Sequence, residues 1–139
     1  MKTKAFSLIE LLVVIALIGI LSAMVFAFNS SAKARGRDTR RVADVNLIAQ
    51  KVQDYYFQNQ SYPADLAVLS PFAPPADPQG IWTYKYKALD QQPFRAFYVY
   101  TRLETGANGN ATVGGDTYYC IGYNSTGGRI CGEGVAWTP

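Results

Sequence analysis

Two cysteines, Cys120 and Cys131, lie near the carboxyl end of this 139-residue chain. One pair of cysteines supplies too few ligands for a structural zinc site. The alternatives are a disulfide, which suits an exported chain, and two free buried thiols in a cytosolic fold. A disulfide would close a loop of about 12 residues and stabilise the domain by roughly 3 kcal/mol. We predict the disulfide, because the amino terminus described below is of an export type.

The sequence lacks the side chains from which most active sites are built. It contains no histidine, which removes the commonest general base and a common zinc ligand. We find no nucleophile beside a base, no phosphate-binding loop and no acid pair. Glu104 and Asp116 flank an asparagine-containing loop, but their spacing matches no calcium motif. We therefore predict no enzymatic activity, no catalytic residue, no metal and no cofactor.

A long apolar segment follows the amino terminus, and one acidic residue, Glu10, lies near its start. From Leu11 to Ala32 the chain has 22 residues without a charge. As a helix this run would be about 33 Å long, enough to cross a hydrocarbon core of about 30 Å. An ionised group at a bilayer centre costs roughly 3 kcal/mol, so Glu10 is a functional candidate that needs a partner.

Three interpretations compete for this segment. A secretory signal peptide would use Lys2 and Lys4 as its basic region and Ala32-Lys33-Ala34 as its cleavage site. Its apolar core is usually shorter and lacks a carboxylate. A plain membrane anchor explains the length but gives Glu10 no role. The third interpretation gives Glu10 a role and rests on a resemblance.

The leader and the apolar segment resemble the amino-terminal signature of type IV pilins and type II secretion pseudopilins. The matching features are a short basic leader, the small residue Ala5, and then F-S-L-I-E-L-L-V-V-I-A-L-I-G-I-L-S-A from Phe6 onward. The resemblance implies that a dedicated peptidase cuts before Phe6, that the new amine is methylated, and that Glu10 serves in assembly. At Ala5 the family usually has glycine. We favour this interpretation over the plain anchor, and the anchor over the signal peptide.

The helix is expected to continue beyond the apolar segment. Apolar residues recur at steps of three and four along the next stretch, namely Val42, Val45, Ile48, Ala49, Val52, Tyr55 and Tyr56. No proline occurs before Pro63, and the residues at 59–63 favour a turn. The sequence therefore predicts one helix from Phe6 to Phe57, apolar all round in its first half and on one face in its second.

The remaining residues predict a small sheet. Alternation of aromatic and polar residues indicates strands, and the predicted elements are a helical turn at 64–69, strands at 81–89, 94–103 and 117–123, a loop at 104–116 and a short return at 129–131. The fold class is α+β, with a long amino-terminal helix packed against three or four antiparallel strands, as in pilins. The expected segments are a leader (1–5), a transmembrane and assembly helix (6–32), an amphipathic half-helix (33–60) and a globular head (61–139).

Charge is concentrated at one place. Five basic residues and one acidic residue between positions 33 and 41 give a local net charge of +4, whereas the whole chain carries +3. This cluster is either a solvated helix face or a contact for anionic lipid head groups or acidic neighbouring subunits. The rest of the chain is not basic, so the isoelectric point does not indicate nucleic-acid binding.

Four N-x-S/T triplets are also present, beginning at Asn29, Asn59, Asn110 and Asn124. The triplet is short and frequent by chance, so the sequence leaves glycosylation open.

These observations predict a structural subunit of a type IV pilus-like helical filament. It would be made as a membrane-anchored precursor with its head outside the cell, and later reside in an extracellular filament. The expected partners are further copies of itself, a prepilin peptidase and methylase, inner-membrane assembly machinery and, before assembly, the lipid bilayer. The alternatives are a pseudopilin of a type II secretion system and a monomeric membrane-anchored binding domain.

Overall fold

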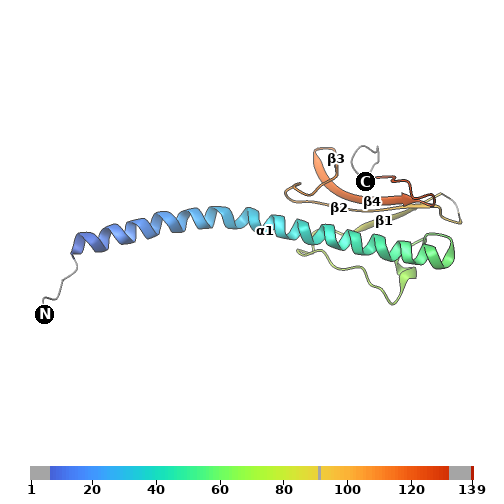
Figure 1. Ribbon diagram of the computed structural model, residues 1–139, viewed down its shortest axis with the longest axis horizontal. Coiled ribbons are helices and arrows are strands. Elements are labelled where there is room, and N and C mark those ends of the chain that lie inside the picture. Colours follow the sequence, from blue (N-terminus) through green and yellow to red (C-terminus); the bar gives the residue numbers. More distant parts are fainter. Residues whose placement is uncertain (1–6, 91, 132–138) are drawn as a thin grey trace. The chain divides into compact units, whose positions relative to one another are not determined.

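The computed structural model describes residues 7–90, 92–131 and 139, and only the main chain of residues 25–29. The chain comprises two compact units, Met1–Lys33 and Ala34–Pro139. Figure 1 shows one long helix, α1, and four strands, β1 to β4.

Helix α1 runs without a break from Leu8 to Asn59, which confirms the predicted continuous helix. It ends at Gln60, whose φ of 55° lies in the left-handed region that commonly terminates helices. The Gln60 N–H still donates to the Tyr56 carbonyl at 2.8 Å. The residue here is not glycine, so the helix end is marked in the sequence by Asn59 and by the following Ser61 and Pro63.

In the first unit, α1 presents large apolar side chains to its surroundings. The most exposed are Leu8 (81%), Ile9 (68%) and Leu21 (63%). The sequence pattern predicts a membrane-spanning segment at residues 6–32. Among the described residues, the structure contains no helix that is both long and apolar enough to cross a membrane.

The second unit contains a four-stranded antiparallel sheet with the order β1-β2-β4-β3. The strands are β1 (Lys85–Leu89), β2 (Ala96–Arg102), β3 (Ala111–Val113) and β4 (Asp116–Asn124). A 3₁₀ helix, η1 (Leu66–Leu69), confirms the predicted helical turn. The central strands β2 and β4 confirm two predicted strands, and a bridge between Tyr123 and Arg129 confirms the short return.

The core of the second unit lies between α1 and one face of the sheet. Val45, Ile48 and Val52 of α1 are fully buried and belong to one cluster with Phe97 and Val99 of β2. Burying a side chain of this size contributes about 1.5–3 kcal/mol, so this cluster is the main source of cohesion. Because side chains alternate along a strand, Tyr98 points to the opposite face of the sheet, where it packs with the two cysteines.

Two predicted boundaries were wrong. The strand expected at 81–89 begins only at Lys85, because Trp82 lies instead under the guanidinium of Arg41, 4.5 Å from the ring centre. The loop expected at 104–116 contains β3, which forms a hairpin with β4. Gly114 and Gly115 make the turn between them with φ of 61° and 88°, a conformation that glycine adopts at little cost.

Candidate functional site

The residues predicted to act in processing and assembly lie at the start of the chain. Ala5 and Phe6 lie outside the described residues. Glu10 lies in the first turn of α1, and its side chain is exposed. Its carboxylate Oε2 accepts a hydrogen bond of 3.0 Å from the main-chain N–H of Ser7.

This contact gives Glu10 a local role that our sequence analysis missed. Ser7 precedes the helix, and Glu10 reaches back over the first turn to an N–H group that has no partner within the helix. Ser-x-x-Glu at a helix start is the signature of a capping box, so the signal was present in the sequence. A carboxylate here also interacts favourably with the positive end of the helix dipole.

The predicted disulfide is confirmed. Cys120 in β4 and Cys131 after the last bridge are bonded, with Cα atoms 5.9 Å apart, and both side chains are fully buried. The amide group of Asn110 pairs with the main chain of Cys120 through two hydrogen bonds of 2.8 Å. The disulfide joins Cys131 to β4, and the Asn110 amide joins the residue before β3 to the same strand.

The basic cluster of α1 is only partly a solvated face. Lys33, Arg35 and Arg40 are exposed, as one of the two interpretations requires. Arg41, by contrast, is fully buried, and the prediction of a solvated face is wrong for it. Arg37 is also engaged, because its Nε donates to Glu104 at 2.8 Å.

Arg41 is the centre of a buried ionic cluster. Its Nε donates to Oδ1 of Asp77 at 2.6 Å, and its Nη1 donates to Oδ1 of Asp38 at 3.0 Å and to Glu104. Asp38 in turn accepts hydrogen bonds of 2.9 and 2.8 Å from the main-chain N–H groups of Glu104 and Thr105. The cluster therefore ties α1 to two segments that are distant from it in the sequence.

The cluster favours the ionised forms of its carboxyl groups. Hydrogen bonds from Arg37 and Arg41 lower the pKa of Glu104 to about 2, although partial burial opposes this. Burial opposes ionisation of Asp77 most strongly, but hydrogen bonds from Arg41 and two main-chain N–H groups outweigh it and lower the pKa to about 2. Burial opposes the charge of Arg41 too, yet its three carboxylate partners raise its pKa. Since every charge has a partner, the cluster acts as a structural tie.

The two acidic residues considered for calcium are therefore occupied by arginines. Glu104 binds Arg37 and Arg41, and Asp116 pairs with Arg102 at 2.5 Å. Among the described residues, no group of three acidic or cysteine side chains is arranged to hold a metal ion.

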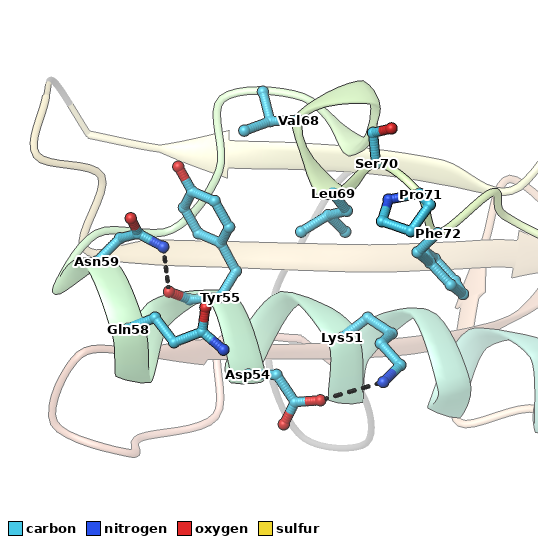
Figure 2. A pocket seen from close by; sticks show the side chains of 10 residues that line it. All are labelled: Lys51, Asp54, Tyr55, Gln58, Asn59, Val68, Leu69, Ser70, Pro71 and Phe72. Atoms are coloured by element: carbon cyan, nitrogen blue, oxygen red, sulfur yellow. Dashed lines mark hydrogen bonds and ion pairs between the residues drawn. The ribbon is translucent and has the colours of Figure 1, made fainter.

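A surface groove of about 600 Å³ lies between η1 and the second half of α1 (Figure 2). Figure 2 shows Lys51 and Asp54 paired along the helix at 3.4 Å, and Asn59 bonded to the carbonyl of Tyr55 at 2.9 Å. Val68, Leu69 and Phe72 line the other side. These polar groups are satisfied by their helical neighbours and do not converge on a common point, so the groove has no arrangement for catalysis.

Comparison with known proteins matches the amino-terminal segment to a described motif. Residues 1–26 match the family model described as the prokaryotic N-terminal methylation motif. The chain carries this motif. This match confirms the resemblance seen in the sequence. Ala5 and Phe6, which flank the predicted cleavage site, and Glu10 all lie within the matched residues.

The chain is also similar to a pilus protein. It is 38% identical over 68 residues to the type IV wide pilus major component PilA4 of Thermus thermophilus. The match covers 49% of this chain and 52% of PilA4, so the chain spans about half the length of this relative. The methylation motif and this likeness make the chain similar to type IV pilins, and its α+β fold with a long amino-terminal helix is pilin-like.

Proposed function

We propose that this chain is a structural subunit of a type IV pilus-like filament. The observation that carries the proposal is the methylation motif at residues 1–26, joined to a helix that continues unbroken into a folded head. The similarity to a major pilus component supports the same function. The exposed apolar side chains of the first unit fit this function, because such a surface needs lipid or other subunits to cover it.

The proposal assigns a sequence of partners. The precursor is held in the lipid bilayer by its apolar helix, with the head on the outer side, where the Cys120–Cys131 disulfide forms. A prepilin peptidase and methylase cuts before Phe6 and methylates the new amine. Inner-membrane assembly machinery then adds the subunit to the filament, in which head-to-tail contacts between identical chains extend without closing into a ring.

Glu10 has an assembly role in this proposal. Cleavage creates a cationic amine at Phe6, and Glu10 of an arriving subunit can pair with the amine of a subunit already in place. An unpaired charge in an apolar bundle is disfavoured by several kcal/mol, so only one axial stagger between helices satisfies both groups. The pair thus sets the register of neighbouring subunits.

Electron microscopy of cells with and without the gene tests the proposal. We expect filaments that are sheared from the surface, contain this chain, and disappear on deletion. Recovery of the chain from the membrane alone, as a monomer, would contradict the proposal and favour an anchored binding domain. A chain found only within a secretion apparatus would favour the pseudopilin alternative.

A further inference from the structure

The four N-x-S/T triplets differ sharply in the structure, and the difference concerns the side-chain nitrogen Nδ2. In N-glycosylation this atom forms the new bond, so it must be accessible and not committed elsewhere. Asn59 does not meet this requirement, because its Nδ2 donates to the Tyr55 carbonyl at 2.9 Å. Asn110 does not meet it either, because its Nδ2 donates to the Cys120 carbonyl at 2.8 Å. The side chain of Asn29 lies outside the described residues.

Asn124 has the opposite arrangement. It ends β4 and opens a turn in which Thr126, Gly127 and Gly128 are exposed. Its side-chain oxygen accepts three hydrogen bonds: 3.1 Å from the N–H of Thr126, 2.7 Å from the Thr126 hydroxyl, and 2.6 Å from the N–H of Gly128. These bonds fix the oxygen toward the turn, and Nδ2 donates to no residue in the described part of the chain. The hydroxyl that defines the triplet therefore holds the acceptor amide in place.

The surroundings of Asn124 also have room for a sugar. A groove of about 280 Å³ begins at Asn124 and Ser125 and is lined by four aromatic side chains, Tyr56, Phe57, Tyr62 and Tyr123. Phe57 is 75% exposed, so its ring is accessible at the rim of this groove. Aromatic walls with a few polar groups at the rim are typical of small-molecule sites, and the apolar face of a sugar ring fits such a wall.

We propose that Asn124 is an N-glycosylation site of this chain. The donor would be an oligosaccharide linked to a polyprenyl pyrophosphate, met on the same side of the membrane where the disulfide forms. Nδ2 attacks the anomeric carbon, the bond from that carbon to the pyrophosphate oxygen breaks, and the lipid pyrophosphate leaves with the electron pair. The proton lost from Nδ2 passes to a base of the transferase. The first sugar then lies along the aromatic groove.

Mass spectrometry of the full chain, isolated from the cells that naturally make it, tests this proposal. Residues 103–129 form one tryptic peptide that contains both Asn110 and Asn124, so electron-transfer fragmentation is needed to place the glycan. We expect a sugar chain on Asn124 and none on Asn59 or Asn110. An unmodified Asn124, or a glycan on Asn59 or Asn110 instead, would overturn the proposal.

Variants separate this chemistry from damage to the fold. Asn124→Gln and Thr126→Ala should lose the sugar mass completely, whereas Thr126→Ser, which keeps the hydroxyl, should retain it. Asn59→Gln is the matched control, because it removes a triplet whose nitrogen is committed, and it should retain the mass. Sugar that persists in Asn124→Gln would lie on another residue, and sugar that persists in Thr126→Ala would form without the triplet. Either result would overturn the proposal.

Discussion

Arg41 of α1 is the centre of the buried ionic cluster in the second unit. Its guanidinium is fully buried and donates to three carboxylates, two of which, Asp38 and Asp77, are themselves almost fully buried. A partnered charge of this kind contributes little net stability, but removing one member leaves the others buried without compensation. Losing one member of the cluster therefore costs more stability than the intact cluster contributes.

Replacing Arg41 by methionine should therefore lower the free energy of unfolding by about 3–5 kcal/mol. Arg40→Met is the matched control, because the side chain of Arg40 is exposed. Substitutions at the surface usually alter the free energy of unfolding by less than about 0.5 kcal/mol. Denaturant unfolding of the detergent-solubilised chain measures both. Equal stability of the two variants would show that the ionic cluster is dispensable.

The cluster also predicts a loss of stability in acid. Asp77 and Glu104 have pKa values of about 2 in the folded protein, below their ordinary values of 3.8 and 4.5. Groups whose pKa is lowered by folding stabilise the protein fully above the unfolded pKa, and this contribution is lost as the pH falls through the folded pKa. We expect stability to fall between about pH 4.5 and pH 2, with Asp77 accounting for about 2 kcal/mol.

Unfolding curves across this pH range test the prediction. Asp77→Asn should flatten the pH dependence, because the carboxyl group that gains the proton is gone. Asp54→Asn is the control, since Asp54 forms only an exposed pair with Lys51, and it should leave the slope unchanged. Glu104 keeps its share of the slope in this variant, so a slope as steep as that of the parent would assign the acid sensitivity to groups other than Asp77.

At the scale of elements, strands β2 and β4 approach each other closely at Gly122. Gly122 faces Tyr98, and a Cβ atom added to Gly122 would lie 2.5 Å from the Phe97 carbonyl oxygen and 2.7 Å from the Tyr98 Cβ. Both atoms belong to the central strand and cannot move freely. The central strand pair therefore requires glycine at this position.

Gly122→Ala should destabilise the head by about 1–3 kcal/mol, the usual cost of forcing extra atoms into a packed region. Gly36→Ala provides a control of opposite sign: it lies within α1 with no atom near the added group, and helix propensity favours alanine by about 1 kcal/mol. Thermal unfolding distinguishes the two. A neutral Gly122→Ala would mean that β2 and β4 separate easily, contrary to the tight pairing described.

The elements that sequence predicts well are those specified by local patterns. The spacing of Val45, Ile48 and Val52 identified the helix face that is buried, and the aromatic residues together with Val99 identified the central strand. What the sequence did not predict depends on contacts between distant residues. Trp82 was assigned to a strand because its alternation is correct, but the cation–π contact with Arg41 removes it from the sheet.

In the candidate site, too, local features could be predicted from the sequence and contacts between distant residues could not. The methylation motif, Glu10 and the disulfide are recognisable from residue types and order. The burial of Arg41 is not, because its partners Asp77 and Glu104 lie 36 and 63 positions away along the chain. The cap between Ser7 and Glu10 is local, and its Ser-x-x-Glu signature is present in the sequence.

At the scale of the whole molecule, Glu10 has two possible roles, which are capping the helix at Ser7 and pairing with the Phe6 amine of another subunit. Glu10→Gln keeps an oxygen that accepts from the Ser7 N–H, whereas Glu10→Leu removes both the charge and the acceptor. We expect both variants to be cleaved but to assemble poorly as the sole subunit, because neither can pair with the amine at Phe6. Filaments are counted after shearing, from cells that hold equal amounts of processed subunit.

Normal assembly of Glu10→Gln alone would assign the role of Glu10 to helix capping. Normal or improved assembly of Glu10→Leu would mean that Glu10 affects only insertion into the membrane, since that change removes the cost of placing a charge in the apolar segment.

The most direct test of a processed filament subunit is the intact mass of the chain in material sheared from the cell surface. We predict a chain that begins at Phe6, carries one methyl group on its terminal amine, and is two hydrogens lighter than the reduced form because Cys120 and Cys131 are bonded. A chain that begins at Arg35, after cleavage at Ala34, would contradict the account, since it would have lost Glu10 and the apolar helix through which the filament is proposed to assemble.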